Sequence, residues 1–520
     1  MVEVTDVLMG PAYHLRLDPR MWQTMQPYPP LGTLYAAAVL RDAGYTVTLL
    51  DTNFATPITD WEHLLGRVRP RFAVIYEDHF NYLSKMCLLR TREAALAMIR
   101  AARQHPCTVI ISSADATDHP ELYLRAGAHF VIIGEGEYTL RDLLHALTGR
   151  TDQPVATIPG LAHADPGSDR VVHTGPRPVI RDLDALPFPA RDLVDMDRYR
   201  DLWTRHHGYF SLNLVTTRGC PYHCNWCAKP IWGQTYNVRS PENVVAEMRV
   251  LKAHYDPDHL WFMDDIMGLQ PGWLARFADL VNRYRVRIPF KCLHRADLLL
   301  RPGEIDALHR AGCAIVWIGA ESGSQRVLDA MEKGIRVEQI HTATRALHAH
   351  GIRVGLFIQF GYPGETWEDI RATLRLIRTC RPDDIGISVS YPLPGTKFYD
   401  RVRDQLGSRQ HWIDSGDLAM LYRGPFPTAF YRQLYRVVHR EFRIRCAVRT
   451  WRTPWRWTRR DLRRWGRALG YLLAWPWDRG RLWMLRHRPH RGIGPLPVEL
   501  SPDEAATPAP VNFHPSRHSD

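Results

Sequence analysis

The sequence predicts an α/β fold in three parts: an N-terminal doubly wound parallel sheet, a central partial (β/α)6 barrel and a helical C-terminal region. Two observations support this prediction. Short β-rich runs alternate with helical stretches over residues 1–150 and again over residues 209–400, and this alternation indicates parallel strands joined by crossover helices. The chain of 520 residues is also long enough for two or three domains that each bury a core.

Residues 1–150 are predicted to form the doubly wound sheet. The strands that we expect there are VTLLD (47–51), FAVIY (72–76), TVIIS (108–112) and FVIIG (130–134). Helical patterns lie between them, as in LYAAAVLRDAG (34–44) and TREAALAMIRAARQH (91–105). Because ligands of such sheets bind at the carboxyl ends of the strands, we expect a binding site at that edge.

Residues 151–208 contain several prolines, glycines and charges with few periodic runs, a composition typical of a linker. The end of this segment, LPFPARDLVDMDRY (186–199), is too apolar to be free coil. We therefore expect a linker that packs on its neighbours.

Residues 209–400 are predicted to form the partial barrel. Its expected strands are SLNLVTT (211–217), HLWFMDD (259–265), PFKCL (289–293), AIVWIGA (314–320), RVGLFIQFG (353–361) and DIGISVS (384–390). Six strand–helix units give a curved sheet that stays open where the last units of a full eight-unit barrel are missing.

Residues 401–490 read as helical and interleave Trp with Arg, whereas residues 491–520 lack an apolar period and are expected to be a disordered tail. The basic, aromatic segment has three interpretations. It could be a helical cap on the barrel, an interfacial helix on anionic lipid, or a nucleic-acid surface that stacks bases. Because no known RNA-binding module is visible, nucleic acid is the interpretation that we favour least, and we expect no such partner.

The composition is that of an ordinary soluble protein, with 45% hydrophobic and 23% charged residues. The first residues show no secretory signal pattern, and no run of about 18 uninterrupted apolar residues is present. Three of the nine cysteines lie within eight residues. This distribution indicates a metal site in a reducing compartment rather than a disulfide scaffold, so we expect a cytoplasmic protein.

The cysteine cluster lies in TTRGCPYHCNWCAKP (216–230), where Cys220, Cys224 and Cys227 have the spacing C-x3-C-x2-C. Cysteine thiolates are the usual ligands of iron–sulfur clusters. Three thiolates on one loop can bind three irons of a [4Fe-4S] cube, which leaves the fourth iron free for a small-molecule ligand.

Two other interpretations of the cluster were weighed. Zinc would need a fourth ligand, normally from a second Cys or His pair; His223 lies inside the loop, but no second pair follows at that spacing. Chance grouping of buried cysteines is less plausible still, because Gly219, Pro221 and Trp226 are typical of a loop. The iron–sulfur interpretation is therefore preferred.

This loop resembles the signature of the radical S-adenosylmethionine (AdoMet) superfamily, and the resemblance extends over residues 209–400. It implies that Cys220, Cys224 and Cys227 hold a catalytic [4Fe-4S] cluster and that Trp226 is the aromatic residue common before the third cysteine. AdoMet would bind the open iron through its amine and carboxylate. An external donor of the flavodoxin or ferredoxin type would supply the electron that cleaves AdoMet to a 5′-deoxyadenosyl radical.

Further segments follow in the order of the family's AdoMet-contacting motifs. They are FMDD (262–265), HRADLL (294–299), GAESGSQRVLDAMEKG (319–334) and FIQFGYPGET (357–366). The resemblance implies that the first cradles the AdoMet amine and the last backs the adenine. The residues implied to contact AdoMet are Asp264, Asp265, Arg295 as a carboxylate partner, and Glu321 and Ser322 at the ribose or carboxylate. Taken alone, each is better explained by a surface or capping role; their order behind the cysteine loop is what favours the functional interpretation.

Three N-terminal segments resemble the cobalamin-binding branch of the same superfamily: YPPLGTLYAAAVLRDAGYTVTLLD (28–51), GAHFVIIGEGEYTL (127–140) and LPFPARDLVDMDRY (186–199). Cobalamin is therefore implied as a second cofactor. Gly32, Gly134, Glu135 and Gly136 are implied to lie in its site, because glycines let the backbone approach a broad corrin closely.

Two motifs of cobalamin domains are missing. The D-x-H-x-x-G motif that supplies a lower-face histidine is absent, so the resemblance implies cobalamin bound without a protein histidine on cobalt (His-off). A glycine-rich turn expected after the third strand is replaced by SSADAT (112–117). His14 and His79 lie near strand ends, where each could approach cobalt or be a surface histidine.

The resemblance implies AdoMet radical chemistry on an unactivated carbon, either methyl transfer or an oxidative or ring-forming reaction. RQLYRVVHREFRIR (432–445) resembles the tail of the anaerobic magnesium-protoporphyrin monomethyl ester cyclase-like group, which is close to hopanoid-associated relatives. We therefore expect a large apolar small-molecule substrate and a loose peripheral membrane contact. The alternative is a non-catalytic cobalamin or Fe–S sensor, against which the intact three-cysteine loop argues.

Overall fold

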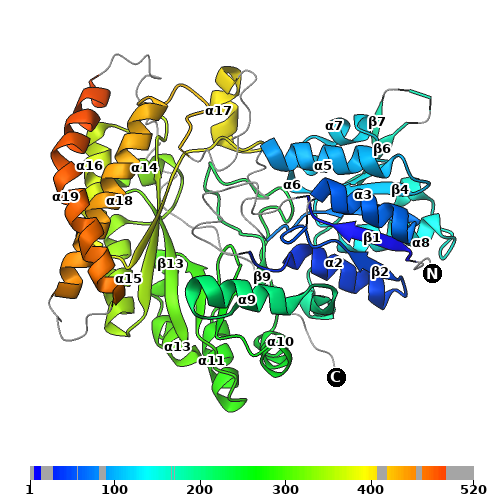
Figure 1. Cartoon of the computed structure of the whole chain (residues 1–520), viewed down its shortest axis with the longest axis horizontal. Coiled ribbons are helices and arrows are strands. Elements are labelled where there is room, and N and C mark those ends of the chain that lie inside the picture. The colour runs from blue at the N-terminus through cyan, green and yellow to red at the C-terminus, as the bar shows by residue number, and fades with distance from the viewer. Residues whose placement is uncertain are drawn as a thin grey trace, which may run out of the picture.

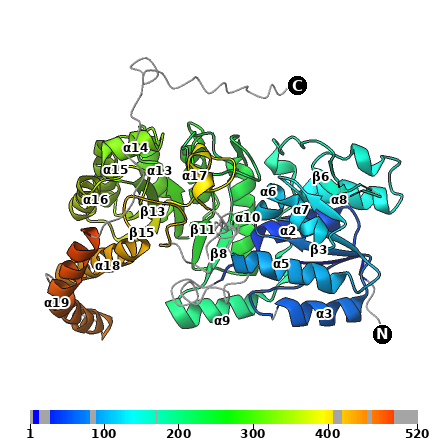
Figure 2. The same cartoon turned by 90° about the horizontal axis from the view of Figure 1, so that it is seen from above.

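The computed structural model places two sheets next to each other, each with its own helices, and a helical hairpin at the far edge (Figure 1, Figure 2). Residues 1–4, 13–26, 56, 81–88, 166, 169, 407–417, 452–458 and 488–520 are outside the described structure. His14 and the tail expected at 491–520 fall in these excluded ranges.

The N-terminal sheet has the strand order β2-β1-β3-β4-β5-β6-β7. Its first five strands are parallel: β1 (Val7–Gly10), β2 (Val47–Leu49), β3 (Phe72–Tyr76), β4 (Thr108–Ser112) and β5 (Phe130–Ile132). The doubly wound sheet is thus confirmed, with β1 as a strand that the sequence did not reveal.

Helices cover both faces of this sheet because alternate residues of each buried strand point to opposite sides. Ala73 and Ile75 of β3 pack with α3 (Pro57–Val68) and α5 (Leu89–Ala102). Val74 packs on the other side with α2 (Leu31–Asp42) and α8 (Glu137–Leu147).

The segment 151–208 is more ordered than its linker-like composition predicts. It forms β6 (Leu161–Ala164) and β7 (Val171–His173), which extend the N-terminal sheet in antiparallel fashion. It then forms α9 (Met196–His207), which ends at Gly208 in the left-handed conformation. Packing of its apolar end on both neighbouring domains agrees with the sequence-based expectation.

The central sheet has the order β15-β14-β13-β12-β11-β8, and every pair in it is parallel. All six expected strands are present: β8 (Ser211–Leu214), β11 (His259–Phe262), β12 (Phe290–His294), β13 (Cys313–Glu321), β14 (Arg353–Phe360) and β15 (Asp384–Val389). The connecting helices include α10 (Pro241–His254), α11 (Trp273–Arg283), α13 (Glu304–Ala311), α15 (Val337–Ala349) and α16 (Trp367–Cys380). The open six-unit barrel is confirmed.

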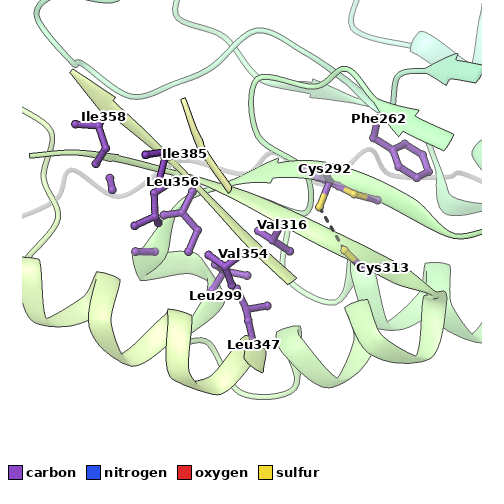
Figure 3. Close-up of a cluster of buried hydrophobic side chains, with 14 of the residues drawn as sticks. Phe262, Cys292, Leu299, Cys313, Val316, Leu347, Val354, Leu356, Ile358 and Ile385 are labelled. Carbon is purple, nitrogen blue, oxygen red and sulfur yellow. Dashed lines mark hydrogen bonds between the residues drawn. The ribbon is translucent and has the colours of Figure 1, made fainter. Parts of the chain in front are cut away.

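One face of this sheet is buried under those helices. Figure 3 shows Val316, Val354 and Leu356 of the sheet meeting Leu347 of α15 and Leu299 of the short helix α12 (Ala296–Leu299). Because side chains alternate along a strand, Lys291, Trp317 and Phe357 belong to the opposite face, which we call the inner face. These three side chains are only partly buried.

The C-terminal region is helical as predicted: α17 (Lys397–Leu406), α18 (Thr428–Trp451) and α19 (Arg459–Arg486). Helix α18 packs on the outer helix α16, where Arg378 and Glu441 form an ion pair of 2.6 Å. Helix α19 lies along α18 at the far edge of the molecule (Figure 1). In the described part of the chain, no helix is both long and apolar enough to cross a membrane.

Candidate functional site

The cysteine loop follows β8 at the carboxyl edge of the central sheet. Its two ends are joined by a small antiparallel ladder between β9 (Thr217–Arg218) and β10 (Asn237–Val238). Gly219 starts the loop with φ +82°, and a Cβ atom there would lie 2.4 Å from the Thr235 carbonyl oxygen. Only glycine fits this position, so the backbone directs the chain sharply from the ladder into Cys220.

The thiols of Cys220, Cys224 and Cys227 are free and lie near one another. Burial raises the pKa of the Cys227 thiol to about 12, with further contributions from Asp265 and the other two cysteines. Burial also raises the pKa of Cys220. The surroundings therefore oppose three thiolates on their own, and a positively charged metal group is what would allow them to ionise together.

A single metal ion and a cubane cluster need different arrangements of ligands. Among the described residues, no three His, Cys, Asp or Glu side chains are gathered so that they could hold a single metal ion. A cubane cluster requires something different, because each thiolate binds a separate iron. The three-cysteine loop meets that requirement, whereas the zinc interpretation would need a tight tetrahedral set.

Asp264 fixes the backbone that leads into the cysteine loop. One carboxylate oxygen accepts hydrogen bonds from the Thr216 and Thr217 amides at 2.6 and 2.9 Å, and the other accepts the Thr216 hydroxyl at 2.6 Å. Burial raises its pKa to about 6. The Asp264 side chain is thus occupied within the protein, whereas Asp265 lies close enough to raise the pKa of Cys220 and Cys227.

Two buried cations lie beside Cys224. The Arg295 guanidinium sits over the Tyr222 ring at 3.6 Å, and Lys333 forms an ion pair of 3.0 Å with Glu321. Burial lowers the pKa of both cations, but nearby negative groups, Cys224 among them, raise it above the usual value. Lys333 is the second-last residue of the segment 319–334 and was not singled out from the sequence.

Glu321 lies at the end of β13 in the left-handed region, with φ +58°. The ladder between β13 and β14 shifts register between Gly319 and Glu321. A non-glycine residue in this conformation is strained by about 1–3 kcal/mol and is typical of functional sites. The strained backbone turns the Glu321 carboxylate toward Lys333.

Ser322 serves a contact inside the protein. Its hydroxyl lies 3.1 Å from the Thr373 hydroxyl of α16 and accepts the Ser324 amide at 3.1 Å. A Cβ atom at the next residue, Gly323, would lie 2.5 Å from the Ala372 carbonyl oxygen, so α16 packs directly on this turn. An AdoMet contact from Ser322 remains a prediction.

The glycines singled out in the N-terminal domain allow close approach between segments of this chain. A Cβ atom at Gly32 would lie 2.9 Å from the His79 amide nitrogen, and one at Gly136 would lie 2.8 Å from the Tyr76 hydroxyl. Gly134 has φ +74° and lies next to Ile231 of the cysteine-loop region. Contacts of these glycines with a corrin remain predictions.

The SSADAT segment keeps the edge of this sheet small without glycine. Ser113 caps the short helix α6 (Ala114–Asp118) by accepting the Ala116 amide at 2.8 Å. Ser112, Ser113, Ala114 and Ala116 are short and buried, so this segment contributes mostly small side chains to the edge. His79 is buried there too, with Nε2 3.1 Å from the Ser112 hydroxyl.

Glu135 connects the two domains. Arg218, the residue before Gly219, forms buried ion pairs with Glu135 at 2.5 Å and with Glu137 at 2.8 Å. Glu135 also accepts the Ile180 amide at 2.5 Å. The side chain implied as a cofactor contact is therefore engaged between the N-terminal domain and the cysteine loop, a role that local sequence did not reveal.

Two family models match the chain. The model of the radical SAM superfamily (SAM is S-adenosylmethionine) matches residues 214–377, and that of the B12 binding domain matches residues 24–144. The chain combines a radical SAM domain with a B12-binding domain, and in this pairing it resembles the cobalamin-binding branch of the radical SAM superfamily. It is a radical SAM enzyme, and its cofactors are a [4Fe-4S] cluster, AdoMet and cobalamin.

Curated relatives cover most of this chain. An uncharacterised methyltransferase of Pyrococcus horikoshii is 26% identical and matches 72% of this chain and 78% of its own. The anaerobic magnesium-protoporphyrin IX monomethyl ester cyclase of Rubrivivax gelatinosus is 23% identical, with coverages of 73% and 67%. The hopanoid C-3 methylase of Methylococcus capsulatus is 26% identical, with coverages of 78% and 75%.

Solved structures show the same fold. The methyltransferase TsrM of Kitasatospora setae, with cobalamin and a [4Fe-4S] cluster bound, aligns with a TM-score of 0.61 at 20% identity and covers 79% of this chain and 76% of its own. The cobalamin-dependent radical enzyme OxsB, with aqua-cobalamin and S-adenosylmethionine, aligns with a TM-score of 0.68 at 16% identity, with coverages of 93% and 72%.

Proposed function

We propose that this enzyme transfers a methyl group to an unactivated carbon of a small molecule, using cobalamin and AdoMet. The observation that carries the proposal is the buried contact from Arg218 to Glu135 and Glu137, which joins the cysteine loop directly to the cobalamin-binding domain. Relatives named as methyltransferases and methylases support the reaction type. When bound, the cluster supplies the electron for AdoMet cleavage and cobalamin supplies the methyl group.

The residues around the loop have separate tasks in this proposal. Cys220, Cys224 and Cys227 would hold the cluster, and Trp226, whose ring centre lies 6.0 Å from Lys333 Nζ, would pack beside it. Arg295 and Lys333 next to Cys224 are suited to the AdoMet carboxylate, since charge-assisted hydrogen bonds to carboxylates are strong. Asp265, which lies near Cys220 and Cys227, would accept a hydrogen bond from the AdoMet amine.

An oxidative or ring-forming reaction is the second candidate, favoured by the likeness to the Rubrivivax gelatinosus cyclase. Anaerobic reconstitution with AdoMet, cobalamin and a reductant, followed by mass analysis of treated small-molecule extracts, separates the two. Addition of a methyl group supports the proposal, and gain of oxygen or loss of hydrogen supports the second candidate. Absence of 5′-deoxyadenosine and of any product would instead support the sensor alternative. An external flavodoxin or ferredoxin type donor and a cytoplasmic location belong to the same proposal.

Cobalamin is expected to bind without a histidine on the lower face of cobalt, because the D-x-H-x-x-G motif is missing. His79, the histidine described near this edge, already has Nε2 at 3.1 Å from Ser112. The electron paramagnetic resonance spectrum of bound cob(II)alamin should therefore show no nitrogen superhyperfine splitting. A splitting that disappears in His79→Ala would contradict the expectation and identify the ligand.

A peripheral membrane contact is the further partner that we propose, through the outer surface of α19. Leu473 and Trp477 are 78% and 74% exposed, and Arg467, Arg479 and Arg481 are also exposed. Asp478, the one carboxylate among residues 465–487, is buried and paired with Arg440. An apolar face with arginines and no exposed carboxylate suits anionic lipid.

Full-length protein is expected to float with anionic liposomes at low salt and to release as salt rises, since exposed charges are screened within about 10 Å at 0.1 M. The double variant L473D/W477D should lose flotation. V250D, which changes an exposed residue of α10, is the matched control and should keep it. Equal flotation of both variants would contradict the α19 contact.

A further inference from the structure

The inner face of the central sheet exposes aromatic surface. Phe357 of β14 is 38% exposed although its strand lies between β13 and β15. It stacks on Trp317 with ring centroids 4.7 Å apart and an interplanar angle of 29°. A Cβ atom at Gly355 would lie 2.3 Å from the Trp317 ring, and one at Gly386 would lie 3.0 Å from Phe357. Two glycines thus let both rings lie close against the sheet.

Stacked, exposed rings inside a domain are unusual, because proteins normally bury large aromatic side chains. An apolar surface with few polar groups is typical of small-molecule sites. The cysteine loop lies at the carboxyl edge of the same sheet, so a molecule resting on Trp317 and Phe357 would be on the face that the open barrel leaves uncovered by its helices.

Lys291 is a cation on this inner face. It pairs in register with Trp261 of β11 and Ile315 of β13, and its Nζ atom lies 3.9 Å from the centre of the Trp261 ring and 5.6 Å from that of Tyr28. Within the described part of the chain, its ammonium group makes no ion pair or hydrogen bond. Burial lowers its pKa to about 7, against a smaller opposing effect of Asp384.

A lysine held against aromatic rings without a direct ion pair is costly to the folded protein, since a desolvated charge is stabilised chiefly when it is paired. The cation–π contacts offset part of that cost. Leu293 pairs with Trp317 and lies two residues beyond Lys291 on the same face. Lys291 is therefore about 7 Å along the sheet from the row that carries Trp317.

We propose that the inner face is the substrate site, in which Trp317 and Phe357 contact a flat apolar body and Lys291 binds an anionic oxygen group of the same molecule. This inference rests on the proposed function, because it names the class of molecule that receives the methyl group. It refines the expectation of a wholly apolar substrate: the site suits an amphipathic molecule with one acidic end.

A binding experiment tests this proposal without any turnover. The probes are 1-pyrenebutyrate, which carries a carboxylate on a flat apolar ring, and its uncharged methyl ester. Both are titrated into the anaerobically reconstituted full-length protein, and pyrene fluorescence reports binding. The acid should bind about tenfold more tightly than the ester, since a charge-assisted hydrogen bond contributes roughly 1.5 kcal/mol.

Four variants test which side chains carry the binding. K291M should abolish the preference for the acid, whereas K291R should retain it. R353M removes an exposed cation from the inner-face position of β14 that lies in the same row as Lys291, and it should keep the preference for the acid. F357A should weaken acid and ester alike.

Equal binding of acid and ester by the unaltered protein, binding of neither, or an unchanged preference in K291M would each overturn the proposal. 5′-Deoxyadenosine formation in the absence of probe is measured on the same samples. If the unaltered protein forms no 5′-deoxyadenosine, that result contradicts the proposed function and not the assignment of the inner face. The failure of the inference and the failure of the proposed function are therefore distinguishable.

Discussion

Replacing Cys220, Cys224 and Cys227 together by alanine is expected to abolish both the brown iron–sulfur chromophore and the formation of 5′-deoxyadenosine. The three thiols are the ligands that the loop offers, so the triple variant leaves the irons without protein thiolates. Iron content should fall from about four per chain to background. Colorimetric iron analysis and chromatography of reaction mixtures measure the two effects.

The control variant removes two cysteines that lie outside the loop and leaves the three loop cysteines in place. Cys107 lies between α5 and β4, and Cys446 lies in α18. Both are partly exposed, like the loop cysteines. The double variant C107A/C446A should retain iron and AdoMet cleavage. Cleavage that persists in the triple variant would show that the cluster is held elsewhere.

The strands of the central sheet could be predicted because each is a short, strongly apolar run bounded by glycine, proline or charge. Strands β6 and β7 could not, since LAHA and VVH are short and partly exposed. They exist because β5 offers an unpaired edge, to which β6 bonds in antiparallel register. Strand formation that depends on a distant edge leaves little pattern in the local sequence.

The residues of the candidate site also differ in how well the sequence predicts them. The cysteines are close in sequence and their spacing carries the chemistry, so they could be singled out directly. Lys333, Arg218 and Lys291 owe their importance to burial against residues from other elements. Arg218 meets Glu135 across 83 positions of sequence, and no motif signals such a contact.

Arg218 is surrounded by the N-terminal domain. Its guanidinium lies 5.3 Å from the Tyr35 ring and 5.5 Å from the Phe80 ring, in addition to its ion pairs with Glu135 and Glu137. All of these groups are buried. Because Arg218 also pairs with Asn237 at the base of the cysteine loop, its side chain fixes the cobalamin-binding domain relative to the cluster.

Arg218→Met is expected to destabilise the protein by about 3–5 kcal/mol, because it leaves two buried carboxylates without their cation. The matched control is Arg41→Met. Arg41 and Asp192 also join the N-terminal domain to the following segment, at 2.7 Å, but their side chains are 43% and 62% exposed. That change should cost about 0–1 kcal/mol. Urea unfolding of both variants measures the difference.

The loss of folding stability in Arg218→Met, which we call the deficit, should also depend on pH. Burial raises the pKa of Glu135 even with Arg218 nearby, and Glu137 raises it further. Removing the guanidinium removes the opposing effect, so the folded-state pKa rises more above its unfolded value. The unpaired carboxylates then destabilise the fold as pH rises through that pKa, and the deficit should be smaller at about pH 5 than at about pH 8.

Adding E135Q and E137Q to Arg218→Met should restore part of the stability, since neutral amides are cheaper to bury than unpaired carboxylates. AdoMet cleavage without substrate should then return, while methyl transfer, which needs the cobalamin domain held in place, stays impaired. A loss in Arg218→Met no greater than that in Arg41→Met, at both pH values, would show that the buried ion pairs do not hold the two domains together.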